Sequence, residues 1–172
     1  MGTLNTTPRT WVASEIVTAA ELNAEIRDPL TALQGPWTSY TPTLTAATTN
    51  PTLGTGGTAT ARVNQIGKTI IGQGRILFGS SGVSAGSGMY SIALPIPAPA
   101  GAVEIITGSA YIYDSSASQT WVGVCRVLAS TPSVFQVLIP GVGGANFLVG
   151  SAAPMTFAAG DAITWSYAYE TS

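Results

Sequence analysis

Hydrophobic side chains recur at every second position through most of this chain, and this period of two constrains the fold more than any other feature. It is clearest near the C-terminus, where Ile163, Trp165, Tyr167 and Tyr169 alternate with small or polar residues. Such alternation is typical of β-strands, whose successive side chains point to opposite faces of a sheet. It predicts strands at 37–46, 58–66, 69–78, 89–95, 104–113, 119–128, 133–139 and 161–170, with a short strand near 154–157 left open.

Some of these strands are apolar on both faces. In the strand at 119–128, the residues Val122, Val124 and Leu128 oppose Trp121, Cys125 and Val127. About eight short strands joined by Gly-rich turns predict an antiparallel β-sandwich of the jelly-roll type. Because no helical pattern separates the strands, something other than a helix must cover the outer face of such a sandwich.

Charged side chains are scarce after the first 28 residues. They make up 8% of the chain, whereas about a quarter is usual in a soluble domain. Six of them lie in residues 1–28, and the other eight are Arg62, Lys68, Arg75, Glu104, Asp114, Arg126, Asp161 and Glu170. A free monomer of this composition would expose a wide apolar and hydroxyl-rich face, and faces of that kind are usually covered by a partner. The composition therefore predicts an assembly subunit.

The first 36 residues differ from the rest and are predicted to form a separate anchor segment, followed by a β-domain at 37–172. Thr18 and Glu21 fit the capping-box pattern that begins a helix. Gly35 and Pro36 end that helix, and Trp11 is a predicted docking residue in the extended arm that precedes it. Its apolar stripe consists of Leu22, Ile26, Leu30 and Leu33.

Pro29 interrupts the predicted helix because its ring clashes with the carbonyl of Glu25 and it donates no hydrogen bond. Either the helix kinks there, or Asp28 caps a second short helix that begins with Pro29. A helix of about 16 residues with one apolar stripe is marginal alone and has to pack on something. We favour self-association with the same helix of neighbouring subunits over packing on the chain's own β-domain.

The sequence argues against catalysis and against bound cofactors or metals. It contains no histidine, so the commonest general base and metal ligand is absent. The β-domain carboxylates are Glu104, Asp114, Asp161 and Glu170, and we expect Asp114 and Asp161 to be solvated turn residues. The single cysteine, Cys125, is expected to be an apolar filler in a strand. The chain is therefore predicted to be non-enzymatic, with no catalytic, cofactor-binding or metal site.

Several kinds of partner are also disfavoured. Net charge is −2 and there is no basic cluster, so nucleic acid would find little to bind. No apolar run is long enough for membrane insertion. Carbohydrate binding stays open, because exposed aromatic residues can stack on sugars; the aromatic residues considered for this are Trp37, Tyr40, Tyr90, Trp121, Trp165 and Tyr167, although each is better explained as core.

The N-terminal run TWVASEIVTAAELN at residues 10–23, with IRD at 26–28, resembles a segment found on many virion proteins of tailed bacteriophages, especially those of actinobacteria. The β-domains attached to that segment are similar to WTSYTP at 37–42, IGKT at 66–69 and the Gly-Asp pair at 160–161. The family commonly has glycine at the position of Ser14 and asparagine at that of Pro29. The resemblance covers most of the chain, and the N-terminal run is its more specific part.

This resemblance implies a structural protein of a phage particle. It implies a homotrimer whose arm and helix dock on other virion proteins of the tail or capsid, while jelly-roll heads face outward. We expect a minor tail protein of the tail-tip or fibre-like kind that could contact a host cell-surface glycan. The alternatives are a capsid decoration or head-fibre protein and, from another class, a carbohydrate-binding module. Docking and self-association are assigned to Trp11, Leu22, Ile26, Leu30 and Leu33.

Overall fold

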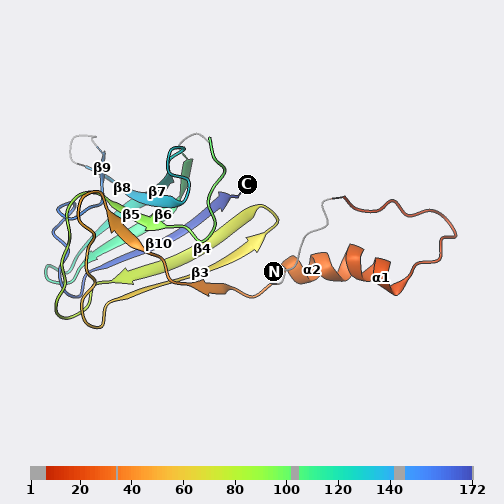
Figure 1. The fold of residues 1–172 in the computed structure, drawn as a ribbon, viewed down its shortest axis with the longest axis horizontal. Helices are drawn as coiled ribbons and strands as arrows, with labels where there is room; N and C mark the ends of the chain where they lie inside the picture. The colour runs from red at the N-terminus through yellow and green to blue at the C-terminus, as the bar shows by residue number, and fades with distance from the viewer. Residues whose placement is uncertain (1–6, 34, 102–104, 142–145, 172) are drawn as a thin grey trace.

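A computed structural model of the chain consists of a β-domain and an N-terminal helical segment that projects from one end of it (Figure 1). The structure describes residues 7–33, 35–101, 105–141 and 146–171. The prediction of a mainly β, antiparallel fold is confirmed, since every paired strand runs antiparallel to its neighbours.

The β-domain is one sheet that curls into a half-barrel around its core. The strand order is β1-β3-β4-β10-β6-β7-β8-β5-β2, and β9 pairs with β8. Its strands are β1 (Thr38–Tyr40), β2 (Leu44–Ala46), β3 (Thr58–Ile66), β4 (Thr69–Leu77), β5 (Tyr90–Ala93), β6 (Ile105–Asp114), β7 (Gln119–Val127), β8 (Val134–Pro140), β9 (Asn146–Leu148) and β10 (Ala162–Glu170). Chain order and spatial order differ, so strands that are distant in sequence become neighbours.

Most predicted strands coincide with observed ones, but the segment 37–46 does not form one strand. It forms β1 and β2, which lie at the two ends of the strand order. Pro42 separates them and is buried; a proline has no N–H to donate to a ladder and ends a strand readily. Strand β9 was not predicted, and residues 154–157 form no strand.

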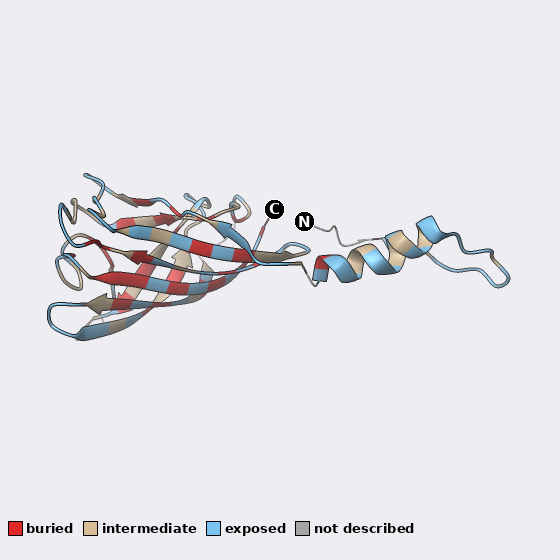
Figure 2. Ribbon diagram, turned by 90° about the horizontal axis from the view of Figure 1, so that it is seen from below, coloured by how far each residue is buried: buried red, intermediate tan, exposed pale blue. Residues whose placement is uncertain are grey.

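Alternation along β10 places its large side chains in the core. Ile163, Trp165, Tyr167 and Tyr169 are buried, while the residues between them are exposed (Figure 2). The strands on either side leave room for the aromatic rings. Trp165 pairs with Gly74 and Ala110, and Tyr167 pairs with Gly72 and Gly108. The core is therefore built by setting large residues of the central strand between small ones.

Replacing Gly72 by alanine should destabilise the β-domain by about 1–3 kcal/mol, the usual cost of overpacking a core. An added Cβ would lie 2.4 Å from Cε2 of Tyr167. The ring cannot move freely, because its hydroxyl hydrogen-bonds to that of Tyr40 at 2.8 Å. Urea unfolding followed by tryptophan fluorescence would measure the change. Gly35→Ala is the control, since its Cβ would make only an ordinary 3.4 Å contact; equal effects of the two variants would refute the packing argument.

On the outer face of the sheet, more of the solvent-exposed side chains carry hydroxyl groups than carry charges. Thr164 and Ser166 on β10 and Thr60 on β3 are exposed there. Val122 on β7, a residue of the strand with two apolar faces, is 67% exposed. Within the described part of the chain no element covers this face, so its covering by a partner stays a prediction.

Candidate functional site

The predicted helix begins where the capping box places it. Thr18 Oγ1 accepts a hydrogen bond from the N–H of Glu21 at 3.3 Å, and the Glu21 carboxylate accepts from the N–H of Thr18 at 2.8 Å. These contacts satisfy donors at the start of α1 (Ala19–Leu22), which would otherwise lack partners. The capping-box prediction is confirmed.

Of the two alternatives for Pro29, the second short helix capped by Asp28 is wrong. The helix continues from α1 through a π-helical turn, η1 (Asn23–Arg27), into α2 (Asp28–Leu33) as one ribbon (Figure 1). Asp28 has helical angles, φ −69° and ψ −41°, and its N–H donates to the carbonyl of Asn23, five residues back. In the wider π turn the chain accommodates the ring of Pro29, which an α-helical turn would press against Glu25.

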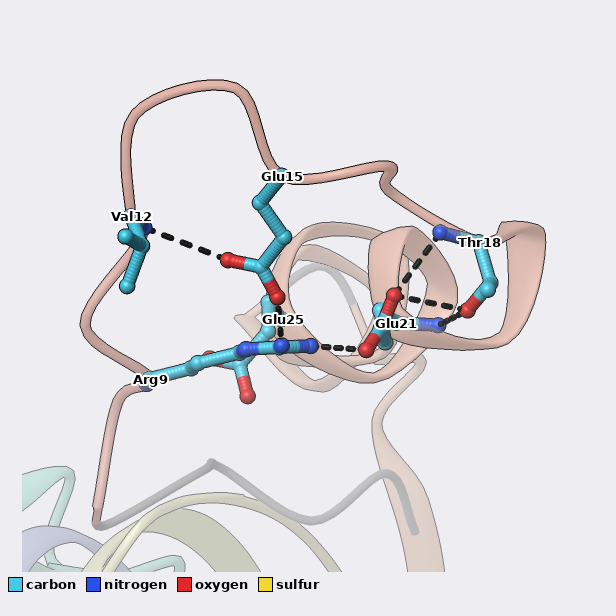
Figure 3. Close-up of polar contacts among 6 residues, drawn as sticks. All are labelled: Arg9, Val12, Glu15, Thr18, Glu21 and Glu25. Atoms are coloured by element: carbon cyan, nitrogen blue, oxygen red, sulfur yellow. Dashed lines mark hydrogen bonds and ion pairs between the residues drawn. The ribbon is translucent and has the colours of Figure 1, made fainter.

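A polar cluster that the sequence analysis missed folds the arm back onto the helix (Figure 3). The Arg9 guanidinium binds the carboxylates of Glu15 and Glu21, and the Arg9 N–H donates to Glu25 at 3.1 Å. Arg9 also stacks over the ring of Trp11, 5.2 Å from its centre. We call Arg9, Glu15, Glu21 and Glu25 the clasp. It holds the arm and the helix together as one unit.

The turn between arm and helix passes through Ser14, which has a φ of 66°. This left-handed conformation is uncommon for residues other than glycine. Ser14 thus keeps the turn that a glycine would make.

The apolar stripe of the helix is not covered by the β-domain, because the helix projects from one end of that domain (Figure 1). Leu22, Ile26, Leu30 and Leu33 are each between 45% and 51% exposed. The helix meets the β-domain at its end, where Ala32 is buried and Asn64 of β3 donates to the carbonyl of Gly35 at 2.9 Å. Packing of the stripe on the chain's own β-domain, the alternative left open above, is therefore wrong.

Trp11 is 43% exposed in the arm, and Val12, Ile16 and Val17 beside it are also exposed. The five predicted docking residues are thus brought together on one projecting unit, residues 7–33, with their apolar surface uncovered (Figure 2). Their docking role stays a prediction.

The clasp makes the anchor sensitive to acid. The backbone hydrogen bond from Thr18, followed by the hydrogen bond from Arg9, lowers the pKa of Glu21 from 4.5 to about 2. A carboxylate with a lowered pKa stabilises the folded form fully above pH 4.5, and this contribution is lost as the pH falls toward 2. We expect the arm to separate from the helix in that window, which an NMR titration of the Glu21 side chain would measure. Titration of Glu21 near 4.5, as in a short peptide, would show that neither the capping box nor the clasp forms.

The carboxylates of the β-domain have structural roles. Asp114 is, as expected, a turn residue: its carboxylate accepts from the hydroxyl of Ser116 and from the N–H groups of Ala117 and Ser116, and these hydrogen bonds lower its pKa. Asp161 is not solvated, contrary to our expectation. It is buried and accepts from the N–H groups of Ser115 and Ala158, so it ties two turns together. Glu104 lies outside the described residues.

Cys125 is buried in β7, as predicted for an apolar filler, and burial raises the pKa of its thiol to about 12. A thiol in this state is a poor nucleophile. Among the described residues no group of acidic or cysteine side chains could hold a metal ion. No helix in the described ranges has the length and apolarity needed to cross a bilayer.

Most of the aromatic residues considered for sugar binding belong to the core. Tyr90, Trp165 and Tyr167 are buried, and Tyr40 and Trp121 are half-buried. Trp37 is exposed and stacks beneath the guanidinium of Arg62. Tyr111, which was not among the residues considered, is exposed on the outer face of β6.

Comparison with known proteins gives no relative from which a function could be transferred: no family model, curated protein or solved structure matches this chain.

Proposed function

We propose that this chain is a non-enzymatic structural subunit that self-associates through its N-terminal anchor, as a homotrimer with outward-facing jelly-roll heads. The exposed stripe of the anchor helix carries the proposal. Four aliphatic side chains at helical spacing face solvent on a folded chain that contains a well-packed core elsewhere. Removing such side chains from water is worth about 1.5–3 kcal/mol each when burial is complete.

The surface area of the chain supports association. The single chain exposes 9239 Å², whereas a compact monomer of 17.5 kDa is expected to expose about 7,900 Å². The difference is in keeping with a projecting anchor. Proteins that keep such a projection usually cover part of it in an assembly.

The biological setting follows from the sequence resemblance. We propose a phage particle, with the anchor docked on other virion proteins and the head exposed as a minor tail protein of tail-tip or fibre-like type. A capsid decoration or head-fibre protein would have the same arrangement, with a docked anchor and an exposed head. Neighbouring genes separate the two locations, because tape-measure and baseplate genes would indicate the tail, and capsid and scaffold genes the head.

Light scattering coupled to size exclusion tests the proposal directly. The full chain should have a mass of about three times 17.5 kDa. A chain that begins at residue 37 should have the mass of one β-domain and still unfold cooperatively. A full chain that stays monomeric at concentrations of tens of micromolar would overturn the proposal.

A further inference from the structure

The outer face of the sheet holds an open groove of about 710 Å³ across β1, β3, β4, β10, β6 and β7. Its volume lies in the range of small-molecule sites, which is roughly 300–1,000 Å³. The groove belongs to a single β-domain and lies on a different part of the chain from the anchor. A ligand there would contact none of the anchor residues, and its binding requires that this part of the outer face is not covered by another copy.

Strand register brings the lining residues together in two rows. The first crosses the sheet as Arg62, Gln73, Ser166 and Ser109, and the second as Thr60, Arg75, Thr164, Tyr111 and Val122. Both rows point outward because their neighbours along each strand point into the core. In each row the arginine lies on β3 or β4, and a residue with a hydroxyl group follows on β10. The row ends at the opposite side of the groove with residues of β6 or β7.

The basic end of the groove has two arginines and no acidic partner. Arg62 and Arg75 occupy diagonal positions on adjacent strands, about 7–8 Å apart between Cα atoms. Arg62 is held in place by Trp37, 5.1 Å below its guanidinium, and Gln73 lies directly opposite Arg62 on β4. None of the described residues that line the groove is acidic.

Arg75 is exposed and makes no ion pair with any described residue. Its planar guanidinium therefore remains available to bind a carboxylate through two parallel hydrogen bonds. Two arginines without counter-charges on one sheet face also repel each other, and an anion between them would remove that repulsion.

The rest of the groove suits a sugar ring. Thr164, Ser166 and Ser109 present hydroxyl groups, which can donate to and accept from sugar hydroxyls. At the far side Tyr111 is 45% exposed beside Val122 and offers an aromatic surface for the apolar face of a pyranose. A neutral sugar would leave the arginines unpaired, and a bare anion would leave the aromatic surface unused.

We propose that this groove binds an acidic saccharide, with a hexuronate carboxylate on Arg75 and Arg62, ring hydroxyls on the serine and threonine row, and a sugar face on Tyr111. The anchor of a second copy is a weaker fit for the same groove. Its glutamates Glu15 and Glu21 are already bound by Arg9, and the anchor projects away from the β-domain.

Calorimetric titration with a tetrasaccharide of galacturonic acid tests the proposal. The matched ligand is the same tetrasaccharide with its carboxylates methyl-esterified, which keeps the rings and removes the charge. We expect the acid to bind at least tenfold more tightly than the ester. Added sodium chloride should weaken binding of the acid but not binding of the ester.

Arg75→Gln should weaken binding of the acid at least tenfold, and Lys68→Gln should not change it. Lys68 is the matched control because it carries the same charge at the exposed turn between β3 and β4. Thermal melting of both variants would confirm that they fold. Equal binding of acid and ester, equal effects of the two variants, or no binding at millimolar concentration would each overturn the proposal. A change of mass in Arg75→Gln without saccharide binding by the wild type would instead assign the groove to contacts between copies.

Discussion

Replacing Leu22 and Ile26 together by aspartate should lower the solution mass from about three chains to one while leaving the β-domain folded. Both side chains lie in the exposed stripe, 45% and 51% accessible, and neither contributes to the core of the β-domain. In an assembled bundle the new carboxylates would be buried without partners, which costs several kcal/mol per ion. In the single chain they would stay in water. Light scattering gives the mass, and the fluorescence melting curve reports on the β-domain.

The matched control replaces Ala20 and Ala24 by aspartate. These residues have the same spacing of four, are exposed, and lie on the side of the helix opposite to Leu22 and Ile26. The two pairs of substitutions add the same charge and replace residues in the same part of the helix. Association should survive in the control. If both double variants dissociate alike, loss of helicity or added charge is the cause, and the stripe is not the interface.

Features that depend on neighbouring residues could be predicted from the sequence. The capping box of Thr18 and Glu21 and the stripe from Leu22 to Leu33 are set by spacings of three and four residues. Likewise the alternation in β10 determines which side chains enter the core once the strand is given. In such patterns the spacing of residues along one helix or strand determines which side chains share a face, so the structure agrees with the prediction.

Features that depend on which strands become neighbours could not be predicted. The segment 37–46 reads as one alternating strand, yet β1 pairs with β3 and β2 with β5. Likewise the groove joins Arg75 to Tyr111 through Thr164, three residues from separate stretches of the chain. A single sequence contains no signal for that pairing, since strand order is decided by the packing of the whole sheet.

Two local interactions were also missed, for a different reason. Asp161 was expected in water because it follows Gly160 in a turn, but its carboxylate is buried and accepts hydrogen bonds from two turns, at Ser115 and Ala158. Arg9 was read as part of an extended arm, although three glutamates at positions 15, 21 and 25 surround it. An excess of acidic over basic residues in the first 28 could have indicated a shared cation.

Replacing Phe135 by alanine should destabilise the β-domain by about 3–5 kcal/mol, the usual cost of removing a buried phenylalanine. Phe135 is on β8 and fully buried. Its ring packs against Trp165 at 5.4 Å and Tyr167 at 5.6 Å, both on β10. Strands β6 and β7 separate β8 from β10 in the sheet, so these ring contacts cross the core of the half-barrel. Removing them opens a cavity where the two sides of the curled sheet meet.

Guanidinium unfolding of the β-domain measures this loss, and Val134→Ala provides the control on the same strand. Val134 is the preceding residue, so it points to the opposite face and is only half-buried. Its truncation should cost about 1 kcal/mol or less. If Phe135→Ala cost no more than the control, the two sides of the sheet would not be joined through these rings. The half-barrel would then be stabilised mainly by the hydrogen bonds between its strands.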